Sequence, residues 1–193
     1  MAGTPLKLIV GLGNPDPEYA HTRHNAGFWF LDELARRHGA SLRYDPKHQG
    51  ELGRARIGAH EVWLLKPMTY MNRSGGPTRS VASFYKIPVE EILVAHDELD
   101  FPPGVVKLKQ GGGAAGNNGV RDLIAQLGDA FWRVRIGVGK PRGTGIEHVL
   151  SRPSKAEEEA IRGTIEVALD AVPLILEQGA QRAMNTLHTS KEQ

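Results

Sequence analysis

Two short apolar stretches, Leu8-Ile9-Val10 and Ile92-Leu93-Val94-Ala95, restrict the possible folds of this chain more than any other feature. Neither stretch alternates apolar with polar residues, as a half-exposed strand would. Each therefore reads as a strand covered on both faces, in the middle of a sheet that has helices on either side. The first runs into a glycine-rich turn at Gly11-Leu12-Gly13. The pattern predicts central strands of an α/β sheet.

Segments with helical spacing lie between the predicted strands. Helices are expected to begin near Thr22, Pro77, Asn118 and the capping box Ser154–Glu157. Further strands are expected at residues 53–57 and 61–65, which form a hairpin, and at 105–109 and 131–139. Strands interleaved with helices predict a largely parallel sheet. With 193 residues, no internal repeat and no low-complexity linker, we expect one domain spanning residues 1–193.

Composition removes several classes of function. The chain has no Cys, which excludes disulfides, thiolate nucleophiles, Cys-ligated zinc and iron–sulfur clusters. The apolar run near the start is too short for a signal peptide or a membrane span, so we expect a cytoplasmic protein without membrane contact. No nucleotide-binding loop ends in Gly-Lys-Ser/Thr, and Asp16 occupies the third glycine position of a dinucleotide fingerprint. No Gly-x-Ser-x-Gly elbow is present.

Charge is distributed unevenly along the chain. The net charge of +2 argues against a nucleic-acid partner, but residues 101–142 carry seven basic and two acidic residues, a local charge of +5. Residues 154–193 carry four basic and seven acidic residues, a local charge of −3. Because local charge governs binding to a polyanion, the central segment could bind a polyanion despite the small net charge. A solvated surface with charged helix ends would give the same count.

Polar residues follow the predicted strands or open the predicted helices. Asn14 follows the first strand and Asp97 follows the second, while Asn72 and Asn118 precede helices. In open α/β sheets the ligand site lies beyond the carboxyl ends of the strands, where such residues would meet. The alternative is that each is only a helix cap or a turn residue.

His24 is the candidate general base. A histidine paired with a carboxylate such as Asp97 keeps one tautomer and can take a proton from water. Amide side chains can bind a peptide's carbonyl and amide groups without adding charge beside the base. His21 and His24 lie three residues apart, but no carboxylate follows at zinc-site spacing, so we expect neither a metal nor a cofactor.

Six co-linear motifs resemble those of the bacterial-type peptidyl-tRNA hydrolase family. They are Leu8–Pro15 with Glu18-Tyr19, Thr22–Gly27, Met71–Gly75, Ala95–Asp100, Gly111–Gly113 through Asn118-Gly119, and Arg133–Gly139. The resemblance spans nearly the whole chain. It implies a single α/β domain with a twisted mixed sheet flanked by helices on both faces, and no required metal. It also implies hydrolysis of the ester that joins a peptide to the 3′ ribose of tRNA.

The resemblance also implies roles for individual residues. It makes His24 the base that activates water and Asp97 its orienting partner. Asn14 and Asn72 would position the water and the substrate, and Asn118 would bind the peptide. Tyr19 and Met71 would contact the substrate in the cleft. Lys109 and Arg135 match basic positions expected to meet tRNA phosphates. Peptidyl-tRNA is then the partner, and we expect a monomer without an obligate protein partner.

One segment departs from the family pattern. After the triple glycine, many members carry His-Gly-Gly-His-Asn-Gly, whereas this chain has Ala114-Ala115-Gly116-Asn117-Asn118-Gly119. Two commonly basic positions are thus replaced, by Ala114 and Asn117. The alternatives to an active hydrolase are a catalytically silent RNA-binding relative and a metal-dependent peptidase that uses His21 and His24.

Overall fold

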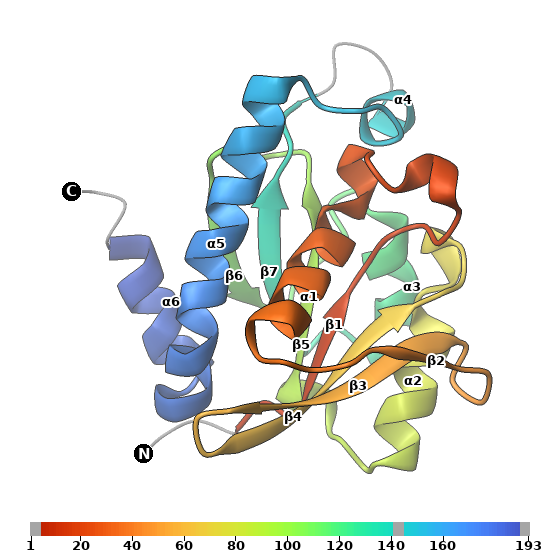
Figure 1. Cartoon of the computed structure of the whole chain (residues 1–193), viewed down its shortest axis with the longest axis vertical. Helices are drawn as coiled ribbons and strands as arrows, with labels where there is room; N and C mark the ends of the chain where they lie inside the picture. Colours follow the sequence, from red (N-terminus) through yellow and green to blue (C-terminus); the bar gives the residue numbers. More distant parts are fainter. Residues whose placement is uncertain (1–4, 141–144, 190–193) are drawn as a thin grey trace.

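The computed structural model of the chain describes residues 5–140 and 145–189 (Figure 1). In these residues seven strands form one sheet in the order β2-β3-β4-β1-β5-β7-β6. The strands are β1 (Leu8–Gly11), β2 (Arg43–Asp45), β3 (Gly50–Ile57), β4 (His60–Pro67), β5 (Ile92–Glu98), β6 (Val106–Gln110) and β7 (Trp132–Gly137). The helices are α1 (Ala26–Arg37), α2 (Gly75–Phe84), α3 (Asn118–Leu127), α4 (Gly145–Val149), α5 (Lys155–Gln178) and α6 (Ala180–Thr189). Short 3-10 turns are η1 (Pro17–Tyr19), η2 (Arg23–Asn25), η3 (Met71–Arg73) and η4 (Val89–Glu91).

The four central strands, β4, β1, β5 and β7, run parallel to one another. The outer strands β2, β3 and β6 are each antiparallel to a neighbour. Every residue of β1 and β5 is buried, as the two continuous apolar stretches predict. The predicted α/β class and the largely parallel mixed sheet are confirmed. Because β1 and β5 are adjacent and parallel, their carboxyl ends meet at one edge of the sheet.

Helices cover both faces of the sheet (Figure 1). Helices α1, α5 and α6 pack on the face that carries Ile9, Leu93 and Val134, and α2 and α3 pack on the face that carries Val10 and Val94. Successive side chains of a strand point to opposite faces, so each central strand contributes to both cores. Fully burying one such aliphatic side chain contributes about 1.5–3 kcal/mol. The two cores fix the strand ends that position the site.

The structure differs from the sequence prediction at the start of the first helix. The helix expected from Thr22 is divided into the 3-10 turn η2 and then α1, which begins at Ala26. The Thr22 side chain caps neither element, and its hydroxyl instead donates a hydrogen bond to the Tyr19 main-chain oxygen at 2.8 Å. The extra turn before α1 carries His24. Among the described residues, none of the helices combines the length and the apolarity needed to span a membrane.

Candidate active site

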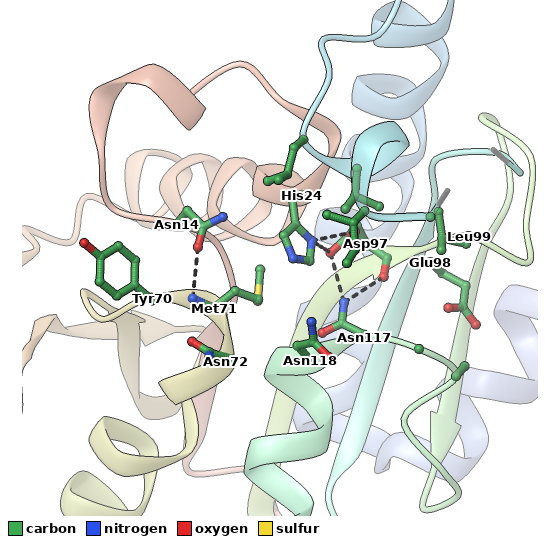
Figure 2. A pocket seen from close by; sticks show the side chains of 16 residues that line it. Asn14, His24, Tyr70, Met71, Asn72, Asp97, Glu98, Leu99, Asn117 and Asn118 are labelled. Atoms are coloured by element: carbon green, nitrogen blue, oxygen red, sulfur yellow. Dashed lines mark hydrogen bonds and ion pairs between the residues drawn. The ribbon is translucent and has the colours of Figure 1, made fainter. Parts of the chain in front are cut away.

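A pocket of about 630 Å³ opens at the carboxyl ends of β1 and β5 (Figure 2). Five separate segments line it in addition to the end of β5: the loop after β1, the turns η2 and η3, the start of α3, and α4. The sequence-predicted residues Asn14, His24, Met71, Asn72, Asp97 and Asn118 are all brought together around this pocket. The expectation that they meet beyond the strand ends is therefore met.

His24 and Asp97 form the buried centre of the site. The Nδ1 atom of His24 lies 3.0 Å from Oδ1 and 2.9 Å from Oδ2 of Asp97. Burial by itself lowers the pKa of His24, but the negative charge and hydrogen bond of Asp97 outweigh burial, so the pKa is raised above its ordinary value. An ionised carboxylate can only accept hydrogen bonds, so Nδ1 of His24 carries the proton. In the neutral ring Nε2 then has a free lone pair. Nε2 faces the open side of the pocket (Figure 2).

A glycine allows His24 to approach Asp97. At Gly27, a Cβ atom would lie 2.4 Å from the Ala95 main-chain oxygen and 2.5 Å from that of Leu12. No real side chain tolerates such contacts, so the first turn of α1 lies directly against the ends of β1 and β5 only because residue 27 is glycine. This close packing places η2, three residues upstream, over the end of β5.

Asn14 is held from two directions. Its main-chain N–H donates to Oδ1 of Asn25 at 2.8 Å, and Nδ2 of Asn25 donates to the main-chain oxygen of Asn14 at 3.0 Å. Its side-chain Oδ1 accepts a hydrogen bond from the main-chain N–H of Met71 at 2.9 Å. The Nδ2 group of Asn14 therefore points toward the side of the pocket where His24 lies (Figure 2). Sequence reasoning gave Asn25 no role.

Asn117 is the most important contact that sequence reasoning missed. Its Nδ2 lies 3.0 Å from Oδ1 of Asp97 and 3.2 Å from the main-chain oxygen of the same residue. Its Oδ1 caps α3 by accepting from the N–H groups of Gly119 and Val120. The Asn-Asn-Gly sequence at a helix start signals an N-cap, but nothing in it indicates a contact with Asp97.

The outer parts of the pocket are both apolar and polar. Met71 is buried, while Asn72 and Asn118 are exposed and reach the pocket from η3 and α3. Leu99, Ile146, Val149 and Leu150 add an apolar wall. The predicted residue Tyr19 does not line this pocket; the tyrosine that does is Tyr70, which is 61% exposed. This mixture of amides and apolar surface suits a peptide segment.

The predicted tRNA contacts Lys109 and Arg135 lie in a neighbouring recess of about 260 Å³. The recess shares Glu98 and Ala115 with the main pocket. Arg135 donates from Nε to Oε1 of Glu98 at 3.1 Å, and Nη2 contacts the same oxygen. Burial raises the pKa of Glu98, although Arg135 acts in the opposite direction. Part of the positive charge of Arg135 is thus neutralised inside the protein.

Arg133 has a structural role despite its place in the basic segment. It is 3% exposed, and its guanidinium donates to the main-chain oxygens of Gly112, Gly113 and Asp129. These bonds fix the glycine-rich loop that leads to Asn117. Arg142, another of the seven basic residues, lies outside the described residues. Because Arg133 is buried and Arg135 is paired with Glu98, the local charge of +5 overstates the charge available to a ligand.

No set of three or more His, Asp or Glu side chains is arranged to hold a metal ion in residues 5–140 and 145–189. His21 is exposed, and Nδ1 of His24 is occupied by Asp97. The described part of the chain thus offers no ligand set for the metal-dependent peptidase based on His21 and His24.

Comparison with known proteins identifies one family. The family model described as peptidyl-tRNA hydrolase matches residues 8–193. A peptidyl-tRNA hydrolase from Cupriavidus pinatubonensis is 51% identical over 195 residues, covering 95% of this chain and 98% of that protein. A crystal structure of peptidyl-tRNA hydrolase from Acinetobacter baumannii superposes with a TM-score of 0.90 at 49% identity, covering 94% of each chain. A structure of an Arg119Gln mutant of the Acinetobacter enzyme gives a TM-score of 0.92 at 48% identity, covering 95% of this chain and 94% of the other.

Proposed function

Because this chain belongs to the peptidyl-tRNA hydrolase family, whose members hydrolyse the ester bond of peptidyl-tRNA, we propose that His24 is the general base of that hydrolysis. The observation that carries the proposal is the contact of His24 Nδ1 with both oxygens of Asp97, at 3.0 and 2.9 Å. This contact fixes the tautomer and leaves Nε2 to accept a proton. Asp97 then stabilises the imidazolium that forms.

The reaction proceeds in two proton transfers. Nε2 of His24 takes a proton from water as the water oxygen attacks the ester carbonyl carbon, and a tetrahedral intermediate with a negatively charged oxygen results. When the intermediate collapses, the bond to the ribose 3′ oxygen breaks and that oxygen takes the proton from Nε2. The products are a peptide carboxylic acid and free tRNA, and His24 is neutral again. General-base help of this kind is worth about 10²–10⁴-fold.

Amide side chains position the reactants. The Nδ2 group of Asn14 lies on the His24 side of the pocket, where it can hold the attacking water or the carbonyl oxygen. Asn72 reaches the pocket from η3 and Asn118 from the start of α3. Both side chains can form hydrogen bonds with the carbonyl and amide groups of the peptide. Met71 supplies apolar contact, and the tyrosine available to the substrate in this pocket is Tyr70 rather than Tyr19.

The tRNA phosphates are assigned to the recess beside the pocket. Lys109 and Arg135 both line it, and it adjoins the main pocket at Glu98. Phosphate contacts carry affinity without reading base sequence, which suits an enzyme that accepts many tRNAs. Because Arg135 is already paired with Glu98, Lys109 is the stronger contributor to the electrostatic part of binding.

We further assign the activity to a cytoplasmic monomer that is a single domain over residues 1–193. The described residues of one chain supply His24, Asp97 and the amides that line the pocket. Light scattering after size-exclusion chromatography should give a mass near 21.1 kDa. A mass of twice that value would contradict the assignment.

The proposed function is tested by measuring the cleavage of a peptidyl-tRNA whose peptide carries a label. The wild-type protein should release the label at catalytic concentrations, and release should continue over many turnovers. Filter binding of the same tRNA serves as the second readout. Binding without release would identify a catalytically silent RNA-binding relative and would overturn the enzyme assignment.

A further inference from the structure

Asn117 joins the acid–base pair to the start of a helix through one buried side chain. The residue is 6% exposed, and its Nδ2 lies 3.0 Å from Oδ1 of Asp97. Its Oδ1 accepts hydrogen bonds of 3.0 Å from the N–H groups of both Gly119 and Val120. The same amide thus satisfies two helix-terminal donors and one catalytic carboxylate.

The orientation of this amide is fixed by its partners. Rotating it by 180° would turn an oxygen toward the Asp97 carboxylate and a nitrogen toward two N–H donors, so all of its contacts would become repulsive. The cap of α3 therefore forces the NH₂ group toward Asp97. The helix itself is anchored, because Gly119 packs against Met71 and Leu12, and a Cβ there would lie 2.5 Å from the Met71 sulfur.

We propose that Asn117 is a positioning residue for the hydrolysis: by donating to Oδ1 of Asp97, it holds that carboxylate in the orientation in which both oxygens face Nδ1 of His24. The inference rests on the proposed role of His24. Many family members carry histidine at this position, and the Asn117 amide supplies a donor that does not titrate. The donor that Asn117 presents to Asp97 therefore does not change with pH.

The other charged groups near His24 contact partners other than Asp97, so they do not orient its carboxylate. Of the residues that line the pocket, Asp97 and Glu98 on β5 are the charged ones, and Glu98 is paired with Arg135. On η2, Arg23 is directed to Glu157 and Ser151. Helix α4, which packs against η2, carries Glu147 and His148, and the latter contacts the Val138 main-chain oxygen.

Three substitutions separate the two functions of the Asn117 side chain. Asn117→Ser keeps a good N-cap acceptor for α3 but is too short to reach Asp97, whereas Asn117→Ala removes the cap as well. Asn117→His replaces the amide with an imidazole, the side chain common at this motif position in the family, whose ring N–H is a donor that can face Asp97. Each variant is measured for thermal unfolding and for kcat and KM on peptidyl-tRNA, alongside the wild-type protein and His24→Ala.

The expected result distinguishes positioning from simple stabilisation. Asn117→Ser should melt close to wild type yet lose about 10-fold to 100-fold in kcat with KM unchanged, since one hydrogen bond to a charged group is lost. Asn117→His should recover most of that loss although it caps the helix less well. A kcat of Asn117→Ser within twofold of wild type would overturn the proposal. So would losses of kcat that simply follow the melting temperatures of the variants.

A fourth variant tests the contact independently of turnover. Asn117→Asp keeps the cap acceptor but places a second carboxylate beside Asp97, and the added negative charge favours protonated His24. The ¹⁵N NMR titration of His24 should therefore shift to higher pH than in the wild-type protein. An unchanged titration would mean that residue 117 does not influence the pair. Activity of His24→Ala near the wild-type level would instead remove the proposed role of His24, whatever the titration shows.

Discussion

Asn25 and Asn14 are joined by two hydrogen bonds that run in opposite directions, one from the Asn14 N–H to Asn25 Oδ1 and one from Asn25 Nδ2 to the Asn14 main-chain oxygen. Asn25 follows His24 directly, and Asn14 follows β1. The pair therefore couples the turn that carries the proposed base to the loop that carries an amide of the same site. Both bonds are buried, so neither partner can be replaced by water without cost.

Asn25→Ala should destabilise the protein and reduce its activity. The change leaves a buried N–H and a buried carbonyl of Asn14 without partners, which costs about 2–4 kcal/mol of unfolding free energy. Urea denaturation measures this loss. Asn25→Asp is the matched variant: it keeps the acceptor for the Asn14 N–H but places a carboxylate oxygen against the Asn14 main-chain oxygen, so it should also be less stable than wild type. An alanine variant as stable as wild type would show that the two hydrogen bonds between Asn25 and Asn14 do not stabilise the fold.

The pH dependence of turnover should reflect the raised pKa of His24. The base must be neutral, so kcat should rise as pH increases through that pKa, with a midpoint above the ordinary 6.5. Asp97→Asn removes the charge that raises the pKa while burial, which lowers it, remains. The acid limb of the pH–rate profile should then move to lower pH, together with a lower plateau. If the acid limb of the Asp97→Asn variant stays at the wild-type pH, Asp97 is not what raises the pKa of His24.

Lys109→Ala should weaken tRNA binding and flatten its salt dependence. Loss of one phosphate contact reduces the slope of log K against log salt by about 1. Lys7→Ala is the matched control, because Lys7 is an exposed lysine just before β1, at the end of the sheet opposite the pocket. It should leave the slope unchanged. Arg135→Ala should reduce the slope less than Lys109→Ala, since Arg135 is already paired with Glu98. Equal slopes for the Lys109 and Lys7 variants would contradict the assigned recess.

Acidification should destabilise the fold through His96. Burial lowers the pKa of His96 to about 4, and its Nε2 has no hydrogen-bond partner in the described structure. The unfolded chain binds this proton near pH 6.5, so stability falls as pH drops from there toward 4, by about 1.4 kcal/mol per pH unit. His96→Gln cannot titrate and should show a flatter dependence of unfolding free energy on pH over that range. Parallel curves for the two proteins would refute this.

The arrangement of the sheet and most of the site could be predicted because they depend on local patterns. The continuous apolar stretches place β1 and β5 in the centre, and polar residues that follow parallel strands must share an edge. Alternation in β7 also predicts that Trp132, Val134 and Ile136 share one face, as they do in the core. These features require no knowledge of distant contacts.

Contacts between distant segments could not be predicted in the same way. A count of charges does not show that Arg133 is buried under the glycine-rich loop or that Arg135 is paired with Glu98. The contact between Asn117 and Asp97 depends on where α3 packs, which no spacing encodes. The prediction of Tyr19 as a pocket residue came from a motif position, and the structure lines the pocket with Tyr70 instead.

The central claim is that His24 activates the water that cleaves the ester. The most direct test is single-turnover cleavage of peptidyl-tRNA by His24→Ala, with the affinity for tRNA measured on the same preparation. We predict that cleavage slows at least 100-fold, the scale of a lost general base, while the dissociation constant for tRNA stays within about twofold. Cleavage at a rate near that of the wild-type protein would contradict the account.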